Sequence, residues 1–93
     1  MRLKPHETRA IKETILNLDP EAKIYLFGSR VDDTLRGGDI DLLILSHNIT
    51  QKDRRNIRVK LFEQIGEQKL DLIIAENDTQ PFVKIALSQG ILL

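Results

Sequence analysis

The chain has 93 residues, enough for one compact domain and too few for two, so we expect a single domain over residues 1–93. Its 14 basic and 14 acidic residues balance, which argues against a nucleic-acid coat and against membrane attachment by charge. Cysteine is absent, which excludes disulfides, zinc–thiolate sites and thiol catalysis. No apolar run is long enough to span a membrane and no signal-peptide core is present, so we expect a cytoplasmic protein.

The first half of the chain predicts one helix and two strands. Apolar residues recur at helical spacing from about Pro5 to Leu18, and Pro5 suits a first helical turn. The segment 23–27 is rich in β-branched and aromatic residues, which is typical of a buried strand. The polar residues 30–39 predict a short helix and a turn, and residues 40–45 predict a second strand.

The second half continues the alternation of helices and strands. A capping-box pattern at residue 50 predicts a helix that runs to about residue 66, and residues 69–75 predict a third strand. Asp78 or Thr79 is expected to open a last helix, which ends at Gly90. The order α-β-α-β-α-β-α favours an α/β or α+β layered domain.

Three aspartates lie in or beside strands that otherwise consist of Leu and Ile: Asp39, Asp41 and Asp71. Burying an unpartnered carboxylate costs on the order of several kcal/mol, so something must compensate. Asp39 and Asp41 project from the same face of a strand, and Asp71 joins them if its strand pairs alongside. Lys69 neutralises such a group only in part. Oxygen-only ligands suit Mg²⁺ or Mn²⁺, so the trio predicts a cation site; the alternative is that each carboxylate faces water or caps a turn.

Gly28 and Ser29 follow the first predicted strand directly. Because Gly28 has no side chain, a ligand can approach the backbone closely there. The following amides and the Ser29 hydroxyl can then hold a phosphate, although a simple turn or helix cap is the alternative. A phosphate site beside carboxylates that bind a metal is what nucleotide chemistry requires.

Two groups of basic residues leave alternatives open. Arg30 and Arg36 either contact phosphate or a partner, or pair at the surface with Asp32 and Asp33. Residues 52–60 contain five basic residues and one acid, which fits a docking face for an acidic partner or a solvated helix face.

The segments Gly28-Ser29-Arg30 and Gly38-Asp39-Ile40-Asp41-Leu42, with the later Asp71, resemble the minimal nucleotidyltransferases of the DNA polymerase β superfamily. The resemblance covers nearly the whole chain. It implies a small mixed β-sheet flanked by helices, with the active site at the sheet edge. It also implies transfer of a nucleoside monophosphate from a triphosphate to a hydroxyl.

Carried over by position, the family pattern assigns each of these residues a role. Gly28 and Ser29, with Arg30 beside them, would bind the nucleotide through its β- and γ-phosphates. Asp39 and Asp41 would bind two Mg²⁺ ions, with Mn²⁺ possible. Asp71 would ligate the catalytic ion and help to activate the hydroxyl. ATP is the expected substrate.

The same resemblance implies a partner, because 93 residues leave little room for an acceptor pocket. Stand-alone relatives are often antitoxins of HEPN-domain toxins and can transfer AMP to the toxin, so we expect a HEPN toxin as acceptor, with a second copy of the chain as another source of the acceptor surface. One alternative is a non-catalytic binding module that occludes its partner. Asp32 and Asp33, standing where many relatives carry a basic residue and a glycine, favour it. Transfer to a small molecule is a further alternative.

Overall fold

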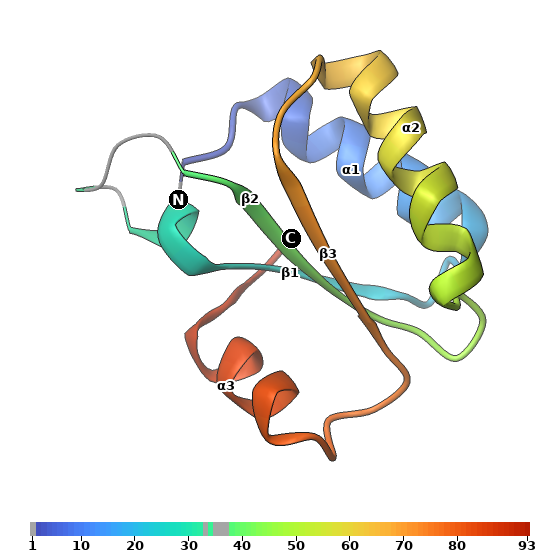
Figure 1. Ribbon diagram of the computed structural model, residues 1–93, viewed down its shortest axis with the longest axis vertical. Coiled ribbons are helices and arrows are strands. Elements are labelled where there is room, and N and C mark those ends of the chain that lie inside the picture. Colours follow the sequence, from blue (N-terminus) through green and yellow to red (C-terminus); the bar gives the residue numbers. More distant parts are fainter. Residues whose placement is uncertain (1, 33, 35–37) are drawn as a thin grey trace.

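A mixed sheet lies between two helices on one face and a third helix on the other (Figure 1). The computed structural model describes residues 2–32, 34 and 38–93, without the side chain of Ser29. Asp33 and Arg36 therefore lie outside the described residues, and the alternatives given for them stay predictions. The helices are α1 (Pro5–Leu18), α2 (Arg54–Ile65) and α3 (Pro81–Gln89); the strands are β1 (Lys23–Phe27), β2 (Ile40–Leu45), β3 (Leu70–Ala75) and β4 (Ile91–Leu92); the 3₁₀ turns are η1 (Gly28–Val31) and η2 (Gln51–Asp53).

The strands follow the spatial order β3-β2-β1-β4. β1 pairs antiparallel with β2 and with β4, while β2 and β3 run parallel. A parallel pair needs a crossover between its strands, and α2 supplies it. The predicted α/β class with a small mixed sheet is thus confirmed.

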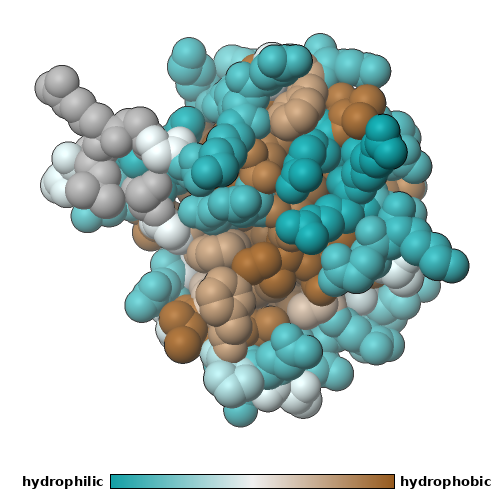
Figure 2. Space-filling view, viewed as in Figure 1, coloured by the Kyte–Doolittle hydropathy of each residue, from teal (hydrophilic) through white to brown (hydrophobic). Residues whose placement is uncertain are grey.

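The two faces of the sheet carry different amounts of apolar packing. Alternate residues of β1, β2 and β3 meet α1 and α2 in the larger core, where Ile11, Leu26 and Leu61 are fully buried. The opposite face packs Leu43 against Val83 and Ala86 of α3. Figure 2 shows apolar side chains reaching the surface beside α3. The α3 face is therefore the less completely covered side of the sheet.

Most predicted boundaries agree with the structure, and the differences have local causes. The strand expected from Lys69 begins at Leu70, and the helix expected from residue 50 begins with η2. There the backbone N–H of Thr50 donates to Asp53 Oδ2 at 2.9 Å, as the capping-box pattern predicts. The cap of α3 is Gln80, because Thr79 instead donates to the side chain of Asn77.

The sequence pattern did not predict β4, which follows Gly90 directly. Gly90 ends α3 as expected, but its backbone is extended, with a φ of −84°, so it is not a left-handed helix cap. A Cβ at this position would lie 2.6 Å from the carbonyl oxygen of Ala86. Gly90 is therefore required by close backbone packing that lets the chain turn back against β1.

Side chains of α2 and its preceding turn cover the open edge of β3. Arg58 Nη2 donates to the carbonyl of Leu70 at 3.0 Å, and Gln51 Nε2 donates to that of Ile74 at 3.1 Å. Such bonds occupy carbonyl groups that an edge strand otherwise offers to another chain. Among the described residues, no helix combines the length and the hydrophobicity that crossing a bilayer demands.

Candidate active site

Asp41 and Asp71 are register partners on the neighbouring parallel strands β2 and β3. Residues paired in this way point to the same face of a sheet, and here that face is the one shared with Leu43 and α3. Asp41 is half-buried, whereas Asp71 is exposed on the edge strand. The structure therefore brings these two predicted carboxylates together at the edge of the sheet.

Gly28 lies directly against Asp41. Phe27 pairs with Asp41 across β1 and β2, so the next residue begins η1 beside that carboxylate. A Cβ on Gly28 would collide with Asp41 Oδ2 unless that carboxylate moved, and the φ of Gly28 is +76°, a value that L side chains rarely adopt. Both observations favour glycine at this position. The close backbone approach predicted for Gly28 is present, and its neighbour is the carboxylate.

The environment of Asp41 disfavours its charge. Burial, followed by a hydrogen bond to Asp71 and the negative charges of Asp71 and Asp39, raises the pKa of Asp41 to about 6, while Lys69 opposes this shift. A group of carboxylates with too little positive charge nearby is expected to behave in this way. The donor set of this cluster, oxygen atoms alone, fits Mg²⁺ or Mn²⁺.

Asp39 precedes β2 and is held by an ion pair. Lys69 Nζ lies 3.5 Å from Asp39 Oδ2, and the Lys69 side chain is 77% exposed. Within the described part of the chain, no three His, Asp or Glu side chains already form a metal-binding group. Asp39 is therefore paired with Lys69 in this structure, and the metal roles of the three aspartates stay predictions.

Among the described residues, Arg30 donates its hydrogen bonds to backbone carbonyls. Its Nη1 donates to the carbonyl of Arg2 at 2.9 Å, and its Nε donates to that of Gly38 at 3.4 Å. The N–H of Arg2 donates in return to the carbonyl of Arg30 at 2.7 Å. Arg30 thus connects η1, the N-terminal segment and the residue before Asp39, which makes it a positioning residue for the site.

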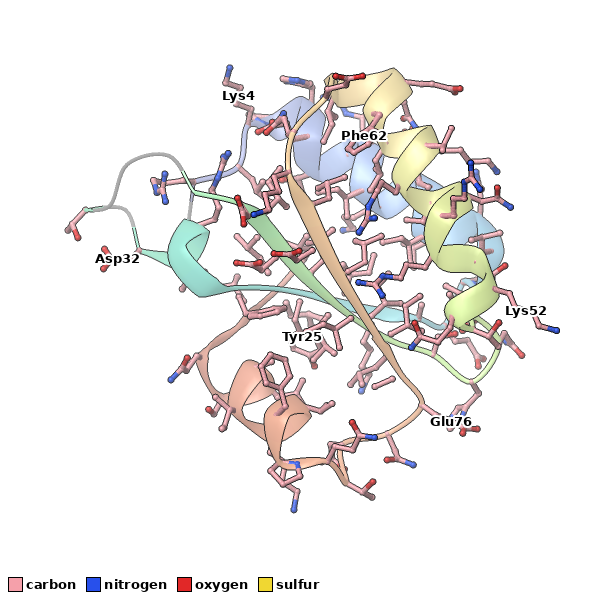
Figure 3. The ribbon with its side chains drawn as sticks, viewed as in Figure 1. Lys4, Tyr25, Asp32, Lys52, Phe62 and Glu76 are labelled. Atoms are coloured by element: carbon pink, nitrogen blue, oxygen red, sulfur yellow. The ribbon has the colours of Figure 1, made fainter. Side chains whose placement is uncertain are left out.

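Asp32 does not face the acidic cluster. Its Oδ1 accepts hydrogen bonds from the backbone N–H and the hydroxyl of Thr34, at 2.8 and 2.6 Å. Figure 3 shows Asp32 at the outer edge of the molecule, away from β2 and β3. These hydrogen bonds hold the pKa of Asp32 below its ordinary value. The charge of Asp32 is therefore directed away from the place where a phosphate would lie beside Gly28.

The sequence pattern did not indicate the contact between Glu7 and Gln68. Gln68 Nε2 donates to Glu7 Oε2 at 2.7 Å, and the backbone N–H of Lys4 donates to Glu7 Oε1 at 2.9 Å. Although burial opposes the shift, these bonds lower the pKa of the buried Glu7. The contact joins the start of α1 to the chain just before Lys69 and β3. The one local sign of this contact in the sequence is that Glu7 is an acidic residue in the first turn of a helix.

Comparisons with known proteins identify the family and the fold of the chain. No curated protein sequence matches the chain. One solved structure similar to the chain is a mutant of the toxin–antitoxin complex MntA-HpeT: a chain of it superposes with a TM-score of 0.70 and 23% identity, over 92% of this chain and 69% of that one. That likeness shows the fold. The family model described as "Polymerase beta, Nucleotidyltransferase" matches residues 9–93. The chain therefore belongs to the polymerase β family of nucleotidyltransferases.

Proposed function

We propose that the chain transfers AMP from ATP to a hydroxyl group of a partner protein in a reaction that depends on Mg²⁺. The observation that carries this proposal is the in-register pair Asp41 and Asp71 beside Gly28, whose backbone leaves no room for a Cβ. Carboxylates for a cation and an open backbone for phosphate then lie side by side, as nucleotidyl transfer requires.

Different residues of the site bind the phosphates and the metal ions. Gly28 and the η1 amides bind the phosphates, as does Ser29 in the family pattern, while Asp39, Asp41 and Asp71 would hold the ions. When bound, Mg²⁺ supplies positive charge that stabilises both the attacking and the leaving oxygens.

The transfer itself exchanges one bond to phosphorus for another. The acceptor oxygen bonds to the α-phosphorus of ATP, the bond from that phosphorus to the bridging oxygen breaks, and pyrophosphate leaves. Asp71 is exposed on the edge strand, so it can accept the hydroxyl proton from an approaching protein. The half-buried Asp41 is less accessible to such a partner.

The likeness to a toxin–antitoxin complex supports an antitoxin role for this chain. We propose that the acceptor is a toxin, and the resemblance read from the sequence makes a HEPN-domain toxin the first candidate. The position of Asp71 supports a separate acceptor, because this side chain is exposed on the edge strand, where another protein can reach it.

The test incubates the chain with labelled ATP, Mg²⁺ and the protein encoded by the neighbouring gene. We expect label on that protein, and we expect the double variant Asp39→Asn with Asp41→Asn to abolish it while retaining the wild-type circular dichroism spectrum. Absence of label with the wild type, or label with the folded double variant, would contradict the proposal.

The same variant tests the non-catalytic alternative, in which the chain neutralises its partner by occlusion. The pairing of Asp39 with Lys69 in place of a ready-made metal site is the observation that favours it. If the folded double variant still neutralises the partner, occlusion is the function. If neutralisation is lost together with label transfer, catalysis is the function.

A further inference from the structure

We propose that a groove on α2 is a docking site for an acidic, amphipathic helix of a partner protein. The α2 groove has a volume of about 570 Å³ and lies along α2 and its preceding turn, and α2 packs on the sheet face opposite the one that carries Asp41 and Asp71. A partner bound there leaves Asp41 and Asp71 uncovered. The residues that line the α2 groove are Gln51, Arg54, Arg55, Arg58, Val59 and Phe62.

The α2 groove contains basic side chains that form no ion pairs with the described acidic residues. Arg54 and Arg55 are exposed, and neither forms an ion pair with a described acidic residue. Asp53, the one acid in residues 52–60, directs its Oδ2 at the backbone N–H of Thr50. Figure 3 shows Lys52 extending away from the same end of α2, into solvent. A ligand that enters the groove therefore meets arginines whose charges are free to bind carboxylates.

A hydrogen bond to β3 fixes Arg58, one of the basic residues of the groove. Its Nη2 is fixed by the carbonyl of Leu70, while its buried Nε has no hydrogen-bond partner among the described atoms. A buried donor without a partner is costly, so Arg58 is held in this position at the expense of one unsatisfied N–H. Because Leu70 immediately precedes Asp71, the fixed end of Arg58 also ties the groove to the strand that carries the candidate catalytic acid.

An apolar strip accompanies the arginines. Val59 is 46% exposed although it is a large hydrophobic residue, and Phe62 is half-buried nearby. Figure 2 shows apolar patches among the hydrophilic side chains over α2. An amphipathic helix presents an apolar stripe flanked by charges, so an acidic one matches this surface in both shape and sign.

Other occupants fit less well. The five basic residues and one acid of residues 52–60 leave nine basic and thirteen acidic residues elsewhere, so the rest of the chain repels a long nucleic acid. A second copy offers no matching helix: α1 carries Arg9 and Lys12 against its two glutamates, and the only charge of α3 is Lys84. The α2 groove therefore fits a different protein.

The test measures binding without any nucleotide, so its outcome is independent of the transfer reaction. The probe is a fluorescent synthetic helix with Leu at positions i, i+3 and i+7 and Glu on both flanks, followed by anisotropy. Charge reversal by Arg54→Glu with Arg55→Glu is expected to weaken binding ~10-fold or more, as expected for losing two charged contacts. The matched control, Lys12→Glu with Lys84→Glu, changes net charge equally on other exposed surfaces and is expected to stay within ~2-fold.

Two further measurements separate the groove from general charge attraction. Val59→Ser is expected to weaken binding ~3-fold by removing exposed apolar contact, and replacing the probe's Glu by Gln is expected to abolish binding. Absence of probe binding, or equal losses in the groove and control variants, overturns the proposal. Tighter binding of a single-stranded RNA oligomer that is lost in the same groove variant also overturns it and assigns the surface to nucleic acid.

Discussion

Asp19 and Asp41 lie near opposite ends of β2, and the protein treats their carboxylates in opposite ways. Ser46 Oγ, just past the end of β2, donates to Asp19 Oδ2 at 2.6 Å, and the backbone N–H of Glu21 donates to Asp19 Oδ1 at 3.0 Å. These bonds lower the pKa of the buried Asp19. At the other end, burial and neighbouring carboxylates raise the pKa of Asp41 to about 6. The difference lies in the partners.

The comparison separates a structural acid from a candidate functional acid. The Asp19 network is complete, because Ser46 Oγ also accepts from the backbone N–H of Ile49 at 2.8 Å. Its cost of burial is compensated inside the chain. Among the residues that the structure describes, the cluster around Asp41 is opposed by the exposed Lys69 alone, so we expect further compensation from a ligand. A shortage of partners, more than burial itself, indicates the place where a ligand is expected.

The largest expected effect comes from Asp41→Asn. Transfer of AMP should fall by ~10³-fold or more, since a carboxylate that stabilises transition-state charge is lost. The free energy of unfolding without metal should instead rise by about 1–2 kcal/mol, because the repulsion with Asp71, which solvent partly screens, is removed. Labelled-ATP transfer and urea unfolding with and without Mg²⁺ measure both effects. A variant that is inactive but also less stable would mean that Asp41 resembles Asp19 and is structural.

Gly28→Ala should come next. The new Cβ collides with Asp41 and the residue keeps a positive φ, so we expect a loss of about 1–3 kcal/mol and a ~10²-fold slower transfer. Gly66→Ala is the matched control, because its φ is +83° but nothing lies within 4 Å of the added Cβ. That variant should also lose about 1–3 kcal/mol through backbone strain but no activity per folded molecule. Equal activity losses in the two variants would show that the contact with Asp41 is irrelevant.

Ser46→Ala tests the hydrogen-bond network of Asp19. Removing the hydroxyl leaves the Asp19 carboxylate and the backbone N–H of Ile49 short of partners, at a cost of about 1–3 kcal/mol. Transfer per folded molecule should not change. Chemical denaturation measures the first quantity, and the labelled-ATP assay at a temperature where the variant is fully folded measures the second.

Lowering the pH should remove the stability that the charged Asp19 carboxylate provides. Since the folded pKa of Asp19 lies below its ordinary value of 3.8, the charged form stabilises the fold above that pH, and this stability is lost as the pH falls through 3.8 toward the folded pKa. Glu7 shifts in the same direction, so the wild type is compared with Asp19→Asn. The difference in urea midpoint between the two should shrink from pH 5 to pH 3. A constant difference would show that the Asp19 charge contributes nothing.

The smallest effect is expected from Lys69→Gln. An exposed ion pair contributes roughly 0–1 kcal/mol, so stability should hardly change. Asp39 is then free to turn toward Asp41, and the Mg²⁺ concentration that gives half-maximal thermal stabilisation should fall ~2–3-fold through the lost competition for that carboxylate. A higher Mg²⁺ requirement would indicate that Lys69 assists the site instead of competing with the ion.

The core strands could be predicted from their runs of apolar residues. The acidic cluster could be predicted because aspartates are out of place in such runs. Asp41 and Asp71 are anomalous within runs of Leu and Ile, and the spacing of Asp39 and Asp41 predicts that these two share a face. Where Asp71 lies depends on how the strands pair. The contact of Glu7 with Gln68 joins residues 61 apart and leaves no periodic signal. β4 has two residues and exists through its pairing with β1. The carbonyl partners of Arg30 likewise depend on tertiary structure, since a guanidinium carries no sign of which acceptor it will meet.

The parallel register of β2 and β3 also restricts how the gene can vary. Side chains alternate across a strand, so inserting or deleting one residue inside β2 or β3 would move the residues beyond that point to the opposite face of the sheet and break the pairing of Asp41 with Asp71 or of the Leu and Ile residues that follow. Changes of length inside these two strands are therefore expected to be rejected by selection. The links that precede and follow β3 can change length without moving Asp71, and natural diversity of size should accumulate there.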